Sequence, residues 1–327
     1  MTESGPKIEE IRASRDRLSE QTLCTPVIRC PAIEARVGGS TEVFAKLEFL
    51  QRTGTFKARG ALATLHGLSG DEIDKGVTAV SAGNHAIATA FAAQAVGTTA
   101  KVVMIRSANS SRVAACRGYG AEVVMADDVH KAFELAHSIR DEEGRFFVHP
   151  FEGPSIALGT GTIGLEISEQ VENLDVVIIP VGGGGLIGGI SNAIKQLNSS
   201  IEVIGVEPEG ADSMHRSFAS GKPESIETIT TIADSLGAPF ALPYSFELTR
   251  KNVDRLTMIN DKQIRETMGF LFQSMSIAVE PACVASTAAL LGPLRKSLQG
   301  KRVLLLMCGS NIDWETFSDL AIFNNAA

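Results

Sequence analysis

The sequence predicts an α/β protein with two open, twisted, mostly parallel sheets and flanking helices. Short runs of β-branched and aliphatic residues recur along the chain, as is typical of parallel strands that are buried on both faces. Helical patterns lie between these runs, and this alternation indicates doubly wound sheets. The length of 327 residues favours two lobes over a single compact unit.

The predicted elements follow in chain order. Predicted strands include 43–46, 77–80, 102–105, 122–125, 176–179, 203–206 and 303–306. Predicted helices include 84–95, 127–143 and 186–197. The β-α units within 77–148 are enough for a small lobe on the substrate side. The flanking segments, 1–76 and 149–327, would then form a larger, discontinuous lobe.

Composition excludes several classes of protein. The net charge of -8 argues against a surface that tracks nucleic-acid phosphates. The five cysteines have no paired spacing, so they predict neither a zinc site nor a disulfide framework. The N-terminus lacks the apolar core of a signal peptide, and the longest uncharged run, 176–194, is too rich in glycine for a membrane span. We therefore expect a cytoplasmic protein without a membrane or nucleic-acid partner.

Lys57 is the first candidate for chemistry. It lies between a Gly/Thr turn and the start of an apolar helix, with Phe56 before it and small residues after it. A lysine in such surroundings loses its proton near neutral pH and forms a Schiff base with an aldehyde. The alternative is an ordinary lysine whose stem lies along apolar surface while its charge stays in water.

A glycine-rich turn follows the predicted strand 176–179 and opens a helix. Backbone N–H groups converge at such a turn, and the helix N-terminus adds positive potential, so the turn is a candidate phosphate site. The same glycines, in the register Gly183-x-Gly185-x-x-Gly188 with Glu207 after the next strand, also fit a dinucleotide fingerprint. A nicotinamide- or flavin-binding protein is therefore a competing interpretation.

Two further motifs follow predicted strands. Ser81-Ala82-Gly83-Asn84-His85 begins a helix after strand 77–80 and is a candidate carboxylate site. Asn84 is alternatively a plain helix N-cap, and His85 a structural histidine. Cys308 follows the last predicted strand, at the sheet edge where ligands collect in open α/β folds, or else is an inert buried thiol.

The ordered set of motifs resembles fold-type II pyridoxal-phosphate enzymes, specifically the threonine/serine dehydratase branch that includes serine racemase-like proteins. The resemblance runs over nearly the whole chain. It rests on Lys46-Leu47-Glu48, the block 53–61, the block 81–86, the run 159–167, the glycine turn, Gly205-Val206-Glu207-Pro208 and the final Gly-Ser-Asn-Ile-Asp at 309–313. It implies the fold of the tryptophan synthase β-like enzymes, with the cofactor in the larger lobe.

The resemblance also implies roles for individual residues. Lys57 would carry pyridoxal 5′-phosphate as a Schiff base, with Phe56 beside the ring and Asn84 on its 3′-oxygen. The phosphate would lie in the turn formed by Gly182, Gly183, Gly184, Gly185 and Leu186. The substrate carboxylate would lie in the loop formed by Ser81, Ala82, Gly83, Asn84 and His85. Cys308 would face the pyridine nitrogen, where a neutral group makes the ring a weaker electron sink and favours β-elimination. Ser235, Leu236 and Gly237 would face the substrate side chain.

Departures from the family pattern narrow the expected reaction. Ala82 stands where racemases of this branch carry a second serine, so we expect dehydration rather than racemisation. Ser213 stands where the divalent-cation site of the branch has an aspartate, which leaves Glu207 and Ala211 as a weak candidate site, and we expect no metal.

The predicted function is a pyridoxal-phosphate-dependent ammonia-lyase that converts a β-hydroxy amino acid of the threonine, serine or 3-hydroxyaspartate type into a 2-oxo acid. The alternatives are an amino-acid racemase, a β-replacement synthase and, more remotely, an NAD-binding dehydrogenase. The resemblance further implies a homodimer.

Overall fold

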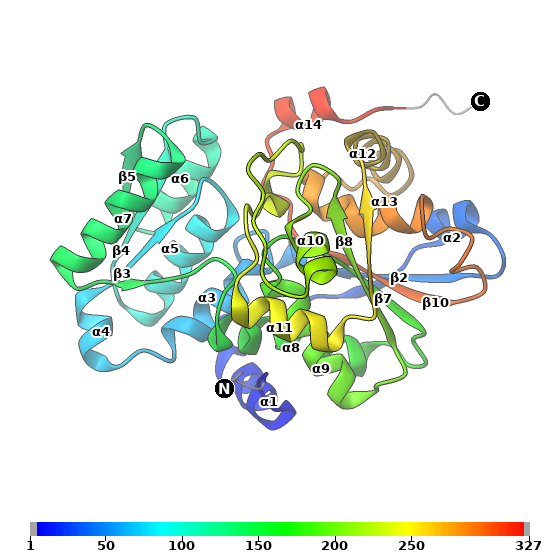
Figure 1. Ribbon diagram of the computed structural model, residues 1–327, viewed down its shortest axis with the longest axis horizontal. Coiled ribbons are helices and arrows are strands. Elements are labelled where there is room, and N and C mark those ends of the chain that lie inside the picture. The colour runs from blue at the N-terminus through cyan, green and yellow to red at the C-terminus, as the bar shows by residue number, and fades with distance from the viewer. Residues whose placement is uncertain (1–4, 324–327) are drawn as a thin grey trace.

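In the computed structural model, which describes residues 5–323, the strands form one six-stranded and one four-stranded sheet (Figure 1). The larger sheet has the order β1 (Val27–Arg29), β2 (Glu42–Leu47), β10 (Arg302–Met307), β7 (Val176–Pro180), β8 (Glu202–Pro208) and β9 (Arg255–Ile259). The smaller sheet has the order β5 (Glu122–Ala126), β4 (Ala100–Ile105), β3 (Val77–Val80) and β6 (Phe146–Phe147). All neighbouring strands pair in parallel except β1 and β2. The predicted fold class is therefore confirmed.

Every predicted strand lies within an observed one, but β1, β6 and β9 were not predicted. β1 and β6 have only three and two residues, too few to give a hydrophobic run. β9 begins at a charged residue and is only partly buried along most of its length, because it lies at an edge of the sheet. Edge strands lack the continuous apolar signal of central parallel strands.

The helices connect and cover the strands. The α-helices are α1 (Ile8–Leu18), α2 (Pro31–Val37), α3 (Lys57–Leu65), α4 (Gly70–Lys75), α5 (Asn84–Val96), α6 (Ser110–Gly118), α7 (Val129–Glu143), α8 (Pro154–Gln170), α9 (Gly185–Leu197), α10 (Ser213–Ser220), α11 (Pro243–Asn252), α12 (Asp261–Met275), α13 (Ala285–Leu291) and α14 (Trp314–Leu320). Short 3-10 helices are η1 (Glu48–Leu50), η2 (Asp234–Leu236) and η3 (Pro281–Val284). The three predicted helices begin and end within two residues of α5, α7 and α9. None of the helices within residues 5–323 is long and apolar enough to cross a membrane.

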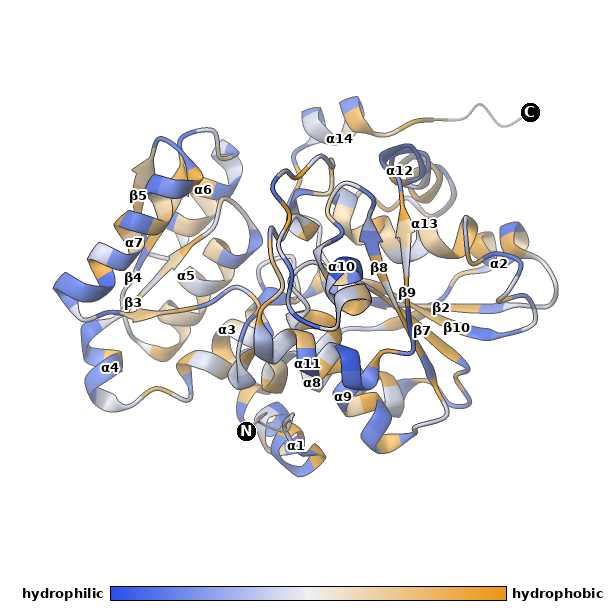
Figure 2. Cartoon of the chain, in the orientation of Figure 1, coloured by the Kyte–Doolittle hydropathy of each residue, from blue (hydrophilic) through white to orange (hydrophobic). Residues whose placement is uncertain are grey.

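The four-stranded sheet is covered on both faces because its side chains alternate. Val102 and Met104 of β4 belong to the apolar cluster that contains α5, whereas Val103 belongs to the cluster that contains α7. In the six-stranded sheet, α13 packs against β7, β8, β9 and β10, while α8 packs against α3 and α9. Figure 2 shows apolar residues gathered on the central strands and polar residues on the outer helices.

The fold brings the chemistry-bearing motifs to one place. β3, β7 and β10 each end at a predicted motif, and parallel strands present their carboxyl ends at the same sheet edge. Lys57 is the first residue of α3, the helix that links the larger sheet to the smaller one (Figure 1). A backbone bridge between Thr55 and Gly309 fixes the start of α3 beside the end of β10.

Candidate functional site

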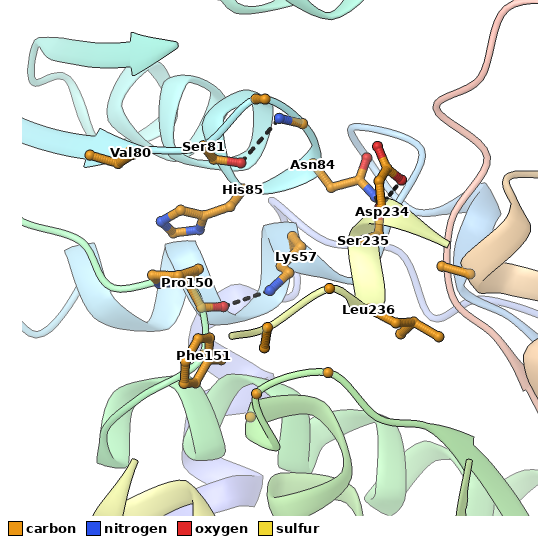
Figure 3. Close-up of a pocket in the computed structure, with 18 of the residues that line it drawn as sticks. Lys57, Val80, Ser81, Asn84, His85, Pro150, Phe151, Asp234, Ser235 and Leu236 are labelled. Carbon is orange, nitrogen blue, oxygen red and sulfur yellow. Dashed lines mark hydrogen bonds between the residues drawn. The ribbon is translucent and has the colours of Figure 1, made fainter. Parts of the chain in front are cut away.

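The predicted site residues line one cavity of about 380 Å³. Its walls come from both sheets, from α3, and from the segment around η2 (Figure 3). Of the predicted residues, those that line it are Phe56, Lys57, Ser81, Ala82, Gly83, Asn84, His85, Gly182, Gly183, Gly184, Gly185, Leu186, Ser235, Leu236, Gly237 and Cys308. Only the metal candidates Glu207, Ala211 and Ser213 lie outside this lining.

Lys57 has an amine poised for nucleophilic chemistry. Its Nζ donates to the backbone oxygen of Pro150 at 2.6 Å and lies 5.2 Å from the centre of the Phe56 ring (Figure 3). Loss of water around the amine lowers the pKa of Lys57 to about 8, although Cys308 and Glu280 act in the opposite direction. About a tenth of the amine is therefore neutral at pH 7, far more than for a lysine with its ordinary pKa. The alternative of a lysine with its charge in open water does not fit this position.

The glycine turn fits a phosphate. Gly184 has φ +90, the left-handed conformation that glycine adopts readily, and it is the N-cap of α9. Among residues 5–323, no acceptor meets the backbone N–H groups of Gly182, Gly183 or Gly184. Unpaired N–H groups at the N-terminus of a helix attract an anion. The turn is close-packed, because a Cβ at Gly183 would lie 2.4 Å from the Phe151 ring.

The turn between β3 and α5 is a second candidate anion site. Within the described part of the chain, the backbone N–H groups of Ala82, Asn84 and His85 have no hydrogen-bond acceptor. They lie at the N-terminus of α5, where the helix dipole favours negative charge. The His85 ring is neutral, because burial and the nearby Lys57 lower its pKa to about 3, and its Nε2–H donates to the backbone oxygen of Val148 at 2.8 Å.

Asn84 is held at both ends of its amide. Its Nδ2 lies 2.8 and 3.0 Å from the two carboxyl oxygens of Glu280, and its Oδ1 accepts from Asn311 Nδ2 at 2.8 Å. The N-cap of α5 is Gly83, so Asn84 is not the helix cap that capping preference alone allowed. Its side chain instead lines the cavity beside Ser235 (Figure 3).

Cys308 is a neutral thiol that lines the cavity. Its hydrogen bond with Cys283 and its burial raise the pKa of the thiol well above the ordinary value. The backbone oxygen of Cys308 accepts from Phe56 N–H, which places the thiol beside the start of α3. The cavity therefore presents an uncharged thiol, and not a carboxylate, to a group bound beside Cys308.

An apolar wall that the sequence analysis missed closes one side of the cavity. It consists of Val80, Ile105, Val129, Ala132 and Phe133, which come from β3, β4 and α7. A series of ring contacts continues from this wall: Phe133–His137, His137–Phe147, Phe147–His149, His149–Phe151 and Phe151–Phe240. Of these rings, Phe133, His149, Phe151 and Phe240 line the cavity. No local motif marks these residues, because they meet only when α7 folds onto its sheet.

Three polar residues of the site were also missed. Glu280 ends the irregular segment after α12 and directly precedes η3. The only sequence signal for it is a charged residue next to Pro281 within an apolar stretch. Arg112 of α6 donates to Asp234 at 2.7 Å and to the backbone oxygen of Asn311. His149 accepts at Nδ1 from the N–H groups of Phe151 and Glu152, and burial lowers its pKa to about 4.

The weak metal candidate is already occupied by protein donors. The Glu207 carboxylate accepts from the backbone N–H groups of Met214 and His215 and from Nδ1 of the His215 ring. Within residues 5–323 there is no cluster of three His, Cys, Asp or Glu side chains that could hold a metal ion. The residues present therefore do not fit a hard divalent cation, which prefers several free oxygen ligands.

Comparison with known proteins identifies the family. The sequence profile of the pyridoxal-phosphate dependent enzymes matches residues 18–309. The chain belongs to this family. It is 51% identical to the phenylserine dehydratase of Ralstonia pickettii, over 97% of each chain. It is 38% identical to the L-threonine ammonia-lyase of Thermotoga maritima, over 94% of this chain and 76% of that one.

The solved structures agree with this assignment. The structure of maize serine racemase covers 97% of each chain, with a TM-score of 0.91 and 32% identity. Family membership excludes the dinucleotide interpretation of the glycine turn as the main function. Members of the family hold pyridoxal phosphate as a Schiff base on a lysine, and Lys57, the glycine turn and Cys308 provide a site that fits the group.

Proposed function

We propose that this chain is a pyridoxal-phosphate-dependent ammonia-lyase whose β-hydroxy amino acid substrate carries an aryl group on Cβ, as phenylserine does. The observation that carries the aryl preference is the apolar wall of Val80, Ile105, Val129, Ala132 and Phe133. An aromatic substituent buries a large apolar area and packs well against rings and branched side chains. The 51% identity to a phenylserine dehydratase supports the same conclusion.

Lys57 is the proposed base. When bound, pyridoxal phosphate withdraws electrons from the substrate and so acidifies the Cα–H bond. Once substrate has displaced Lys57 from the cofactor, the free amine of Lys57 removes the proton from Cα of the substrate. A pKa near 8 suits this role, because a general base works best when its pKa lies near the working pH.

Two anion sites fix the orientation of the reacting groups. The N–H groups of the glycine turn hold the cofactor phosphate, and those of Ala82, Asn84 and His85 hold the substrate carboxylate. Because His85 and His149 are both neutral, neither adds charge beside Lys57.

The side chains present favour elimination over racemisation. Racemisation needs a proton donor on the face of Cα opposite Lys57, and Ala82 has no titratable group there. Cys308 is a neutral partner and therefore leaves the ring a weaker electron sink. The β-hydroxyl leaves with a proton as water, and its loss relieves the charge that develops at Cα as the Cα proton is removed. Hydrolysis later consumes one water, so no net water is formed. The enamine product tautomerises and is hydrolysed, so the net products are a 2-oxo acid and ammonia.

The test is 2-oxo acid release from the cofactor-loaded protein with phenylserine isomers, threonine, serine and 3-hydroxyaspartate. We expect kcat/KM for a phenylserine isomer to exceed that for threonine by about 10- to 200-fold, the range that apolar pocket contacts supply. Phe133→Ala should lower kcat/KM for phenylserine and leave that for threonine nearly unchanged. Leu135→Ala, on the exposed side of the same helix, is the matched control.

Three outcomes would overturn the proposal in whole or in part. Equal rates for phenylserine and threonine would remove the aryl preference but keep the ammonia-lyase. Inversion of serine or phenylserine at a rate rivalling 2-oxo acid release would point instead to the racemase alternative. A strong increase in turnover on adding a thiol acceptor would point to β-replacement.

The remaining expectations complete the proposal. We propose a homodimer in the cytoplasm, with residues 77–148 as the substrate-side domain and 1–76 with 149–327 as the cofactor domain. The distribution of strands between two sheets supports the division. Light scattering of the purified protein measures the oligomeric state directly.

A further inference from the structure

Glu280 is a buried carboxylate in the cavity wall for which the chemistry above has no use. It is only 1% exposed and directly precedes η3. No lysine, arginine or histidine of the described chain lies within ion-pair distance of it. Burying a carboxylate without a cation is costly, so the fold retains Glu280 against a penalty.

The two short hydrogen bonds of Glu280 go to Asn84 of the proposed cofactor site, and Ser235 also hydrogen-bonds the carboxylate. Both carboxyl oxygens lie within 3.0 Å of Asn84 Nδ2. At the other end of the amide, Asn311 Nδ2 donates to Asn84 Oδ1 and is itself anchored on the backbone oxygen of Thr53. A carboxylate accepts hydrogen bonds only, so it rejects an Asn84 amide that is rotated to present its oxygen.

We propose that Glu280 is a positioning residue that acts through Asn84: it fixes the amide so that one N–H is held by the carboxylate and the other stays available to the ring 3′-oxygen of pyridoxal phosphate. This inference rests on the proposed function, because it gives Asn84 the role described there. An asparagine amide has two hydrogens, one for the Glu280 carboxylate and one for the ring oxygen. In the structure the second hydrogen has only a long contact, 3.3 Å from Nδ2 to Ser235 Oγ, which the ring oxygen would replace. The preorganised donor then costs no reorientation when the cofactor binds.

The charge of Glu280 makes this arrangement depend on pH. The pKa of Glu280 is raised to about 7, mainly by burial and also by Asp234, while Asn84, Arg112 and Ser235 act to lower it. The other titratable groups that face it are Lys57 of α3 and Cys308 after β10. When pH falls through about 7, Glu280 gains a proton and no longer discriminates against the rotated amide.

A double-mutant cycle on pyridoxal phosphate binding tests the inference without requiring turnover. The apoproteins of wild type, Glu280→Gln, Asn84→Ala and the double variant are titrated with pyridoxal phosphate, and Kd and the position of the cofactor absorption band are recorded. We expect Glu280→Gln to raise Kd about tenfold and to shift the band, because a hydrogen bond to a charged group is being weakened. In the Asn84→Ala background the same change should alter Kd less than about twofold.

Further variants separate positioning from folding. Glu280→Asp keeps the charge, so the pH dependence of Kd through about 7 should persist in it and be lost in Glu280→Gln. Exposed Glu247→Gln is the control for charge removal. An equal effect of Glu280→Gln with and without Asn84, or no effect in wild type, would overturn the inference. Tight cofactor binding without 2-oxo acid release would instead refute the proposed function. The coupling between Glu280 and Asn84 could still be measured from Kd in that case.

Discussion

The two sides of α3 differ in whether a basic side chain has a carboxylate partner. Arg59 and Lys57 lie two residues apart, so they face different directions from the helix. Arg59 is 1% exposed and bonds both Glu48 and Glu166, while Lys46 joins the same cluster through Glu166 at 2.5 Å. In this ionic cluster every charge has a partner of opposite sign. On the cavity side, Lys57 has only the backbone oxygen of Pro150.

This difference separates structural from functional charge. A buried ion pair keeps both groups ionised and rigid, and it is inert as long as both partners remain. A buried group without a counterion has a shifted pKa and is ready to exchange a proton or bind a ligand. Glu280 repeats the pattern among the carboxylates, because it lies on the cavity side and its pKa is raised to about 7.

The largest expected effect comes from the unpaired cation. Lys57→Ala should lower 2-oxo acid release by at least about 10³-fold, since it removes both the attachment point of the cofactor and the proposed base. Stability against urea should stay close to that of wild-type apoprotein, because the amine has no counterion to strand. Exposed Lys131→Ala is the control. Substantial residual turnover would refute the role of Lys57.

Removing a charge from the ionic cluster should have the reverse effect: a large loss of stability with little loss of turnover. Glu166→Gln leaves Lys46 and part of Arg59 without a counterion, and breaking a buried pair costs about 3–5 kcal/mol of unfolding free energy. We expect turnover of the remaining folded protein to be nearly normal. Urea unfolding and activity at low temperature measure the two quantities separately.

A surface pair provides the matched control for this experiment. Arg106→Ala breaks an exposed pair with Asp127, which is worth about 0–1 kcal/mol. A loss for Glu166→Gln no larger than that for Arg106→Ala would show that the ionic cluster is not the stabilising region described above.

The sequence was sufficient for the parts of the site that are local. Lys57 at a helix start and the glycine turn after a strand are contiguous patterns with a direct physical meaning, and both line the cavity. Glu280 and Phe133 could not be found in this way. Glu280 becomes informative only because Asn84, almost two hundred residues earlier, lies beside it. Their importance arises from tertiary packing, which carries no local signature.

A smaller effect concerns pH. The neutral amine is the form that attacks an aldehyde, so the rate at which apoprotein captures pyridoxal phosphate should rise with pH and level off above the Lys57 pKa of about 8. The neutral fraction grows about tenfold between pH 7 and pH 9 and changes little beyond. Stopped-flow absorbance measures the rate. A rate that continues to climb steeply towards pH 10.5 would mean that Lys57 behaves as an ordinary exposed lysine.

The smallest expected effect concerns Glu207, another buried carboxylate. Glu207 resembles the paired carboxylates of the ionic cluster rather than Glu280 in the cavity. Its oxygens already accept hydrogen bonds from Met214 N–H, His215 N–H and the His215 ring. We therefore expect EDTA, and then millimolar Mg²⁺, to leave both Tm and turnover unchanged. A cation present at 100 times its Kd would stabilise the protein by about 2.7 kcal/mol, which is an easily measured rise in Tm.

A cation could bind at Glu207 only by displacing His215 and both backbone N–H groups. That exchange would replace three short contacts with a ligand set in which Ser213 stands in the place of a carboxylate, and Ser213 Oγ has no hydrogen-bond partner of its own among residues 5–323. A Ser213→Asp variant supplies the missing charge. If Mg²⁺ raises Tm in that variant and not in wild type, then the lack of a carboxylate at position 213, and not the pairing of Glu207 with His215, is what keeps a cation from this site.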